Sequence, residues 1–165
     1  MTNIPIAEII LNKLKQLAVP MGKQEFSRKE YNRLFPRGAV ETPIGKVKLG
    51  ENQFEKLKAK KRMDLLGAMH QTLSDPVVII AEEKDGKRAR LYIKTFLDEG
   101  DSKTDHLMAV VAIIDDEAVV ISTGKRRKGQ IENKIKMAGS PLYLKGEEDG
   151  SPTRGTRAQA PLPGT

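Results

Sequence analysis

Residues 119–137, VVISTGKRRKGQIENKIKM, pass from a strand pattern to a helix pattern, and the rest of the chain is arranged around this change. The run Val119–Ile121 is β-branched and follows two consecutive aspartates, which predicts a buried strand. Ile131 and Ile135, four residues apart, give the next segment the apolar stripe of a short helix. The sequence therefore predicts a turn over Ser122–Lys128, between the strand and the helix.

The predicted turn combines three kinds of group that suit an anionic ligand. Gly124 allows a ligand to approach the backbone closely, and two hydroxyl side chains precede it at the end of the strand. Four consecutive cations follow, at the start of the predicted helix: Lys125, Arg126, Arg127 and Lys128. These groups fit a polyanion, most simply a nucleic-acid phosphate. A solvated basic turn that only keeps the protein soluble has the same composition, and this alternative stays open.

Composition points to one basic domain. The 165 residues include 29 Lys and Arg against 22 Asp and Glu, so the formal net charge is +7 at pH 7. This excess is larger than solubility requires and indicates an anionic partner. Nucleic acid fits better than a membrane, because no amphipathic or spanning segment accompanies the charge. A hydrophobic content of 38% is enough for one domain with a core.

Several classes of site are excluded or disfavoured. Cysteine is absent, which excludes disulfides, thiolate nucleophiles and cysteine zinc sites. With His70 and His106 as the two histidines, a His-rich metal site is disfavoured, and we expect no metal and no cofactor. The first 25 residues lack the pattern of a signal peptide or a membrane span, so we expect no membrane partner and a cytoplasmic location.

Residues 1–38 are predicted to form N-terminal helices. Apolar residues recur at helical spacing over Ile6–Leu17, and Pro20 follows the end of this pattern. A second helix is predicted to begin at Ser27, which forms a capping-box pair with Glu30, and to end before Pro36.

Residues 39–145 are predicted to form an α+β domain that continues from these helices. Thr42–Gly45 has the composition of a turn, and Lys46–Leu49 that of a half-buried strand with Lys46 and Lys48 on its polar face. A helical pattern then covers Glu51–Leu73, as one helix or as two helices broken near Lys60.

Four apolar segments follow Pro76 and predict strands: Val77–Ala81, Arg90–Phe96, Leu107–Ile114 and Ala118–Ile121. Their hairpin-sized connections indicate an antiparallel meander. The predicted fold class is therefore α+β. It has N-terminal helices packed on a four-stranded antiparallel meander sheet, an optional fifth strand at the segment 141–144, and a short helix after the last main strand.

Two further expectations concern Lys94 and the end of the chain. Lys94 lies between Tyr92 and Phe96 on one face of its predicted strand, either as a functional cation or as a stem that snorkels along the sheet. Residues 146–165 are rich in Gly and Pro and poor in large apolar side chains, so we expect a disordered tail.

Four motifs taken in order resemble a known family: Thr42–Gly50 (TPIGKVKLG), Thr72–Pro76 (TLSDP), Tyr92–Lys94 (YIK) and Ile121–Thr123 (IST). Over about residues 40–144 the chain resembles the phage-associated nucleases that share a fold with barnase, EndoU, colicin-type toxins and RelE-type toxins, the BECR fold. The resemblance implies N-terminal helices packed on an antiparallel sheet that bears the active site. It also implies RNA cleavage in many members, and membership of larger mobile-element proteins.

The chain departs from the family pattern at Gly124, where the resemblance implies a histidine after Ser-Thr. Cleavage of RNA through the 2′-hydroxyl requires a proton acceptor, a proton donor and cations that stabilise charge on the phosphate. Without this histidine, either the cations act by electrostatics alone or the protein binds without cutting. His70, in an apolar helix, and His106, at the edge of a polar loop, are more readily explained as packed or surface residues.

The leading hypothesis is therefore a metal-independent endoribonuclease, with an inactive nucleic-acid-binding module or a protein-interaction module of a mobile element as alternatives. The candidate catalytic residues are Lys46, Lys94, Ser122, Thr123 and Arg126. The candidate nucleic-acid-binding residues are Lys48, Lys125, Arg127, Lys128 and Gln130. The expected partners are RNA or another nucleic acid and, from the resemblance, a protein inhibitor of the immunity or antitoxin kind.

Overall fold

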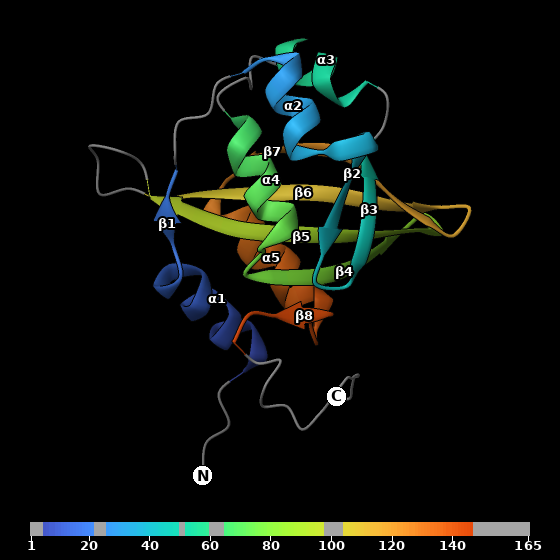
Figure 1. Ribbon diagram of the computed structural model, residues 1–165. Helices are drawn as coiled ribbons and strands as arrows, with labels where there is room; N and C mark the ends of the chain where they lie inside the picture. The colour runs from blue at the N-terminus through green and yellow to red at the C-terminus, as the bar shows by residue number, and fades with distance from the viewer. Residues whose placement is uncertain (1–4, 22–25, 50–51, 60–64, 98–103, 147–165) are drawn as a thin grey trace, which may run out of the picture.

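The computed structural model of the chain describes residues 5–21, 26–49, 52–59, 65–97 and 104–146 (Figure 1). Its elements, in chain order, are α1 (Ile6–Gln16), β1 (Val19–Pro20), α2 (Arg28–Leu34), the 3-10 helix η1 (Pro36–Gly38), β2 (Ala39–Thr42), β3 (Gly45–Leu49), α3 (Gln53–Ala59), α4 (Leu66–Ser74), β4 (Val78–Lys84), β5 (Lys87–Leu97), β6 (Thr104–Ile114), β7 (Glu117–Arg126), α5 (Lys128–Ala138) and β8 (Tyr143–Leu144). The helical pattern of residues 51–73 thus contains α3 and α4 as separate helices.

The α+β class and the central antiparallel meander β4–β5–β6–β7 are confirmed, but the predicted sheet of four or five strands is too small and too uniform. The described strands lie in the order β2-β3-β7-β6-β5-β4-β8, and β1 pairs with the end of β5. The sheet is mixed, because β3 runs parallel to β7 and β1 parallel to β5. These additional pairings join residues distant in sequence, and local periodicity does not report such contacts.

The predicted cationic turn after Ile121 is wrong, because β7 continues through Arg126. The ladder with β6 extends to the pairs Leu107–Lys125 and His106–Arg126, so backbone hydrogen bonds hold this polar segment extended despite its low strand propensity. The register shifts at a β-bulge, where Val111 pairs with Val120 but Val110 pairs with Ser122. Strand and helix are consequently joined by little more than Arg127.

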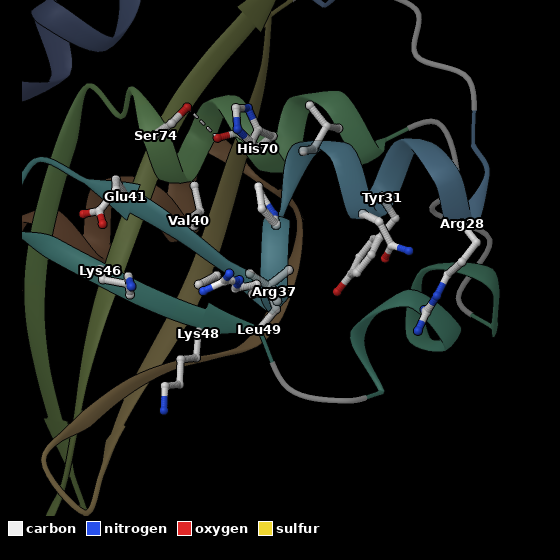
Figure 2. Close-up of a pocket in the computed structure, with 15 residues that line it drawn as sticks. Arg28, Tyr31, Arg37, Val40, Glu41, Lys46, Lys48, Leu49, His70 and Ser74 are labelled. Carbon is white, nitrogen blue, oxygen red and sulfur yellow. Dashed lines mark hydrogen bonds between the residues drawn. The ribbon is translucent and has the colours of Figure 1, made fainter.

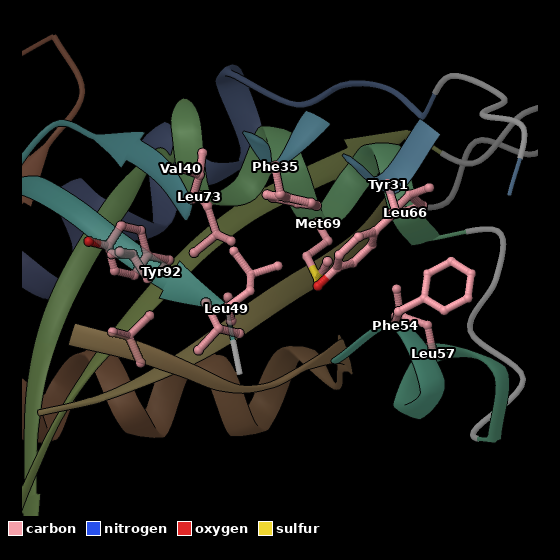
Figure 3. Close-up of a cluster of buried hydrophobic side chains, with 14 of the residues drawn as sticks. Tyr31, Phe35, Val40, Leu49, Phe54, Leu57, Leu66, Met69, Leu73 and Tyr92 are labelled. Atoms are coloured by element: carbon pink, nitrogen blue, oxygen red, sulfur yellow. The ribbon is translucent and has the colours of Figure 1, made fainter. Parts of the chain in front are cut away.

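Both faces of the meander are covered. On the first, which we call the α4 face, residues of α2, α3, α4 and the β2–β3 hairpin form one core with strand residues such as Tyr92, and Phe35 and Met69 lie in its centre (Figure 3). On the second, the α5 face, Ile10 of α1 and Ile135 of α5 pack on strand residues. Side chains from the middle of the sheet are therefore enclosed on either side.

Lys94 is one of the enclosed side chains, with 2% of its surface exposed. Its Nζ donates to the backbone oxygen of Asp75 at 2.7 Å and to the Asp75 carboxylate at 3.1 Å, just beyond the end of α4. Lys145, after β8, donates to the same carboxylate at 2.7 Å. Burial lowers the pKa of Lys94 below its usual 10.5, and Asp75 opposes that shift. This polar cluster fastens the end of α4 to β5 and to the end of the sheet.

Within the described residues, no helix combines the length and the apolar composition required to cross a bilayer. Of the segment predicted to be a disordered tail, residues 147–165 lie outside the described part of the chain. The boundaries predicted at residues 38 and 145 stay predictions.

The core on the α4 face can be tested by truncation. Phe35→Ala should lower the free energy of unfolding by about 3–5 kcal/mol, because it removes a ring that is 1% exposed and leaves a cavity. Met137→Ala, at a side chain 85% exposed, should change it by less than about 0.5 kcal/mol. Urea denaturation measures both values, and equal losses would contradict the described core.

The polar cluster predicts unequal effects for its two members. Asp75→Ala leaves the buried Lys94 ammonium without a carboxylate and should cost about 1.5–3 kcal/mol of stability. Lys94→Met removes the buried charge itself, keeps the volume and leaves Asp75 paired with Lys145, so the cost should stay below about 1 kcal/mol. Denaturant unfolding at neutral pH compares the two variants, and a larger loss in Lys94→Met would contradict this account.

Candidate nucleic-acid interface

The residues proposed for the site from β7 alternate between the two faces of the sheet. Thr123 pairs with Ala109 on the α4 face and is only 4% exposed. Ser122 pairs with Val110, which packs into the core on the α5 face. Because paired residues share a face, Ser122 and Thr123 point in opposite directions.

The other catalytic candidates are spread still further. Lys94 is the buried lysine on the α4 face, bonded to Asp75. Lys46 and Lys48 are exposed on β3, in a groove beside the β2–β3 hairpin. The structure therefore does not gather the five proposed catalytic residues on one surface.

Gly124, the position at which the resemblance implies a histidine, lies inside β7 and not in a turn. It pairs with Met108, which belongs to the core on the α5 face. A side chain at position 124 would therefore be directed toward this core, not toward an open ligand site.

The cationic run does form one surface, which we call the strand-end groove. It is a hollow of about 600 Å³ where β6 begins, β7 ends and α5 starts. Its lining residues are Thr104, Asp105, His106, Lys125, Arg126, Arg127 and Lys128. Four cations thus face one carboxylate, and the carboxylate of Asp105 is 3.4 Å from the Lys125 ammonium. The groove is a positively charged site built at the ends of two strands.

His106 is the imidazole of this groove. The ladders pair Thr95 with His106 and His106 with Arg126, so the three side chains stand in a row across β5, β6 and β7 on the α5 face. Thr95 is fully buried, and its Oγ1 lies 2.8 Å from His106 Nδ1. Either atom can donate; when Nδ1 donates, Nε2 is left with a lone pair. Thr95 thereby fixes the orientation of the ring.

Burial lowers the pKa of His106 below its usual 6.5, and the neighbouring Lys128 lowers it further. Asp105 and Glu132 oppose this shift without reversing it. The ring is therefore mostly neutral at pH 7 and able to accept a proton. Its place beside the cations was missed because His106 was interpreted from its local sequence alone. If the register at the β6–β7 turn had been continued along both strands without a bulge, His106 would have been paired with residue 125, one position from its actual partner Arg126.

The start of α5 adds to the positive potential. The Arg127 amide donates to Gln130 Oε1 at 3.2 Å, so the Gln130 side chain caps the helix. Arg127 and Lys128 stand at the positive end of the helix dipole, where cations are unfavourable. An anion bound there would offset both positive contributions.

The second histidine, His70, lies on α4 and lines the groove beside the β2–β3 hairpin. Its ring packs edge-on against Phe35 with centroids 5.4 Å apart, and burial together with Arg33 lowers its pKa. Across the described residues, no three His, Asp or Glu side chains gather closely enough to hold a metal ion. The strand-end groove therefore offers a neutral imidazole and four cations as its chemical groups.

Comparisons with known proteins agree with this outline of the fold. No curated protein and no solved structure matches the chain. A family model described as phage-Barnase-EndoU-ColicinE5/D-RelE like nuclease2 matches residues 22–143. This range extends from before α2 to the start of β8 and contains every residue of the strand-end groove. Since the match covers well over half of the chain, the protein belongs to this family of nuclease-like proteins.

Proposed function

We propose that the protein is a metal-independent endoribonuclease-like domain that binds RNA phosphate in the strand-end groove. The observation that carries this proposal is the row Thr95–His106–Arg126, which sets an oriented, neutral imidazole beside the cationic run. A neutral imidazole is the group that transesterification of RNA requires as a general base, and arginines suit the extra charge on phosphorus.

The reaction needs few groups. Nε2 of His106 accepts the proton of the 2′-hydroxyl, and the 2′-oxygen attacks the neighbouring phosphorus. The bond from phosphorus to the 5′-oxygen breaks, and the leaving oxygen takes a proton from water. The hydroxide formed from this water takes the proton from His106, which restores the neutral ring. The products are a 2′,3′-cyclic phosphate and a free 5′-hydroxyl. Arg126 and Arg127 lower the barrier by stabilising the additional negative charge of the pentacoordinate intermediate.

A second candidate is a module that binds RNA in the same groove without cleaving it. The observation in its favour is Gly124, because the position where the family resemblance implies a histidine has no side chain and faces a core. Both candidates assign RNA phosphate to the strand-end groove, and they differ only in whether His106 performs proton transfer.

Cleavage by His106 can be measured directly. Purified protein incubated with mixed RNA in EDTA should yield 2′,3′-cyclic phosphate ends, and His106→Ala should reduce the rate by about 10²–10⁴-fold. Lys15→Ala serves as the control, because Lys15 is exposed on α1 and lines neither cationic groove. A rate in His106→Ala as high as in the control would contradict the assignment. Intact RNA that is nevertheless retarded on a gel supports the binding module.

The pH dependence follows from the lowered pKa of His106. As a general base, His106 works in its neutral form, which prevails above that pKa. The value of kcat/KM should therefore be flat near neutrality and decline only as the pH falls through the lowered pKa of the ring, which lies below the usual histidine value of 6.5. Initial rates from about pH 5 to 8 give the profile. Activity that rises with acidity in this range would mean that the protonated ring is the working form.

A further inference from the structure

The β2–β3 hairpin carries a second cationic groove, which we call the hairpin groove. It has a volume of about 830 Å³ and lies between α2, η1 and the outer surface of the hairpin (Figure 2). The charged residues at its wall are Arg28, Arg37, Lys46, Lys48 and Glu41. Four permanent cations against one carboxylate make this groove as positive as the strand-end groove.

Arg37 stands in this groove in a backbone conformation that side chains rarely adopt. Its φ is 57° and its ψ is 26°, in the left-handed region, and Gly38 follows with φ of 67°. Glycine would adopt this conformation without strain, whereas arginine does not. Strained residues of this kind occur preferentially at functional sites. The strain at Arg37 is an independent sign that the guanidinium has a task in the groove.

The hairpin supplies two further cations in a line. Lys46 and Lys48 alternate with the buried Val47 on β3 and so project from its outer surface, about 7 Å apart along the strand. This spacing is of the order of that between neighbouring phosphates in an extended nucleic-acid strand. Within the described residues, the ion pairs include neither Arg37 nor Lys46. Lys48 pairs with Glu117 at 2.8 Å, but both side chains are more than half exposed, so the pair is readily exchanged for a phosphate.

The end of the groove at α2 offers a platform for an unpaired base. The Arg28 guanidinium carbon lies 4.9 Å from the centre of the Phe54 ring and 5.6 Å from that of Tyr31. These contacts hold a planar cation on aromatic rings, and bases of single-stranded nucleic acids stack on such groups.

We propose that the hairpin groove is a second phosphate-binding site, which holds a single-stranded segment of RNA apart from the strand-end groove. The inference rests on the proposed function in taking RNA as the ligand. Lys46 and Lys48 on β3 and Lys125–Lys128 at the end of β7 then bind phosphates at two separate places. The domain holds the strand at one groove while the other performs the chemistry.

Binding of a strand that cannot be cleaved tests this proposal separately from catalysis. The probe is a fluorescent oligodeoxythymidine, which lacks the 2′-hydroxyl. The test variant is Arg37→Gly with Lys46→Ala, in which glycine relieves the backbone strain and so protects the fold. The charge-matched control is Lys15→Ala with Lys136→Ala, at exposed sites on α1 and α5.

Fluorescence anisotropy against salt concentration gives the number of phosphate contacts. The slope of log K against log salt is negative, and each lost contact with a single strand reduces its magnitude by about 0.7. That magnitude should therefore fall by about 1.4 in the test variant and not at all in the control. A slope unchanged in the test variant would overturn the second site.

Stoichiometry separates this proposal from the function of the strand-end groove. Calorimetric titration with a probe of about four nucleotides should find two sites per chain, and one in the test variant. Arg126→Ala with Arg127→Ala should also leave one site. If the unchanged protein has one site and only Arg126→Ala with Arg127→Ala removes it, the proposal for the hairpin groove is overturned and that for the strand-end groove stands. If only the test variant removes the single site, the strand-end groove is overturned instead. If the unchanged protein does not bind the probe, both proposals are overturned.

Discussion

Coverage of the central meander on both faces is the constraint that decides where a ligand can bind. Tyr92 and Lys94 point into the core beneath α4, and Ile93 and Met108 into the core beneath α5. In the middle of β5, the side chains of residues 91–96 are all buried, so none of them is available to a large polyanion. Two cationic grooves of the described residues lie instead at the ends of strands and at the outer surface of the hairpin.

The bulge in β7 determines which cation stands beside the imidazole. On the side of the β6–β7 turn, Val111 pairs with Val120. Beyond the bulge, each β6 residue pairs with a β7 residue one position further along the chain, so Arg126, not Lys125, lies opposite His106. Lys125 is thereby placed on the other face, where it approaches Asp105. The single extra residue of the bulge thus places Arg126, whose guanidinium has more hydrogen-bond donors than an ammonium, beside the proposed base His106. It also places Lys125 near Asp105, the one carboxylate of the groove.

Sequence patterns predicted the elements better than their long-range pairing. Alternation and turn residues identified the strands of the meander, and the capping pair Ser27–Glu30 marked the start of α2, where the Glu30 amide donates to Ser27 Oγ. The parallel pairing of β3 with β7 involves two residue pairs and leaves no periodic signal. The extension of β7 was missed because lysine and arginine have low strand propensity, which the ladder with β6 overrides.

The cationic run of the candidate site was predicted from composition, whereas the imidazole beside it was not. The run Lys125–Lys128 was predicted to suit a polyanion, and it lines one groove. His106 belongs to another strand, so its proximity depends on register, which no local pattern contains. Lys94 illustrates the opposite error, because its position between aromatic residues suggested a functional cation, whereas the packing of α4 buries it against Asp75.

The central claim is that RNA phosphate meets this domain at strand ends and at the outer surface of the β2–β3 hairpin, and not in the middle of the meander. Amide chemical shifts of ¹⁵N-labelled protein, titrated with a 2′-O-methyl RNA that cannot be cleaved, test it most directly. The account predicts large changes at residues 104–106 and 125–128, and small ones at residues 92–94 in the middle of β5. Large changes at residues 92–94, with none at the ends of β6 and β7, would contradict it.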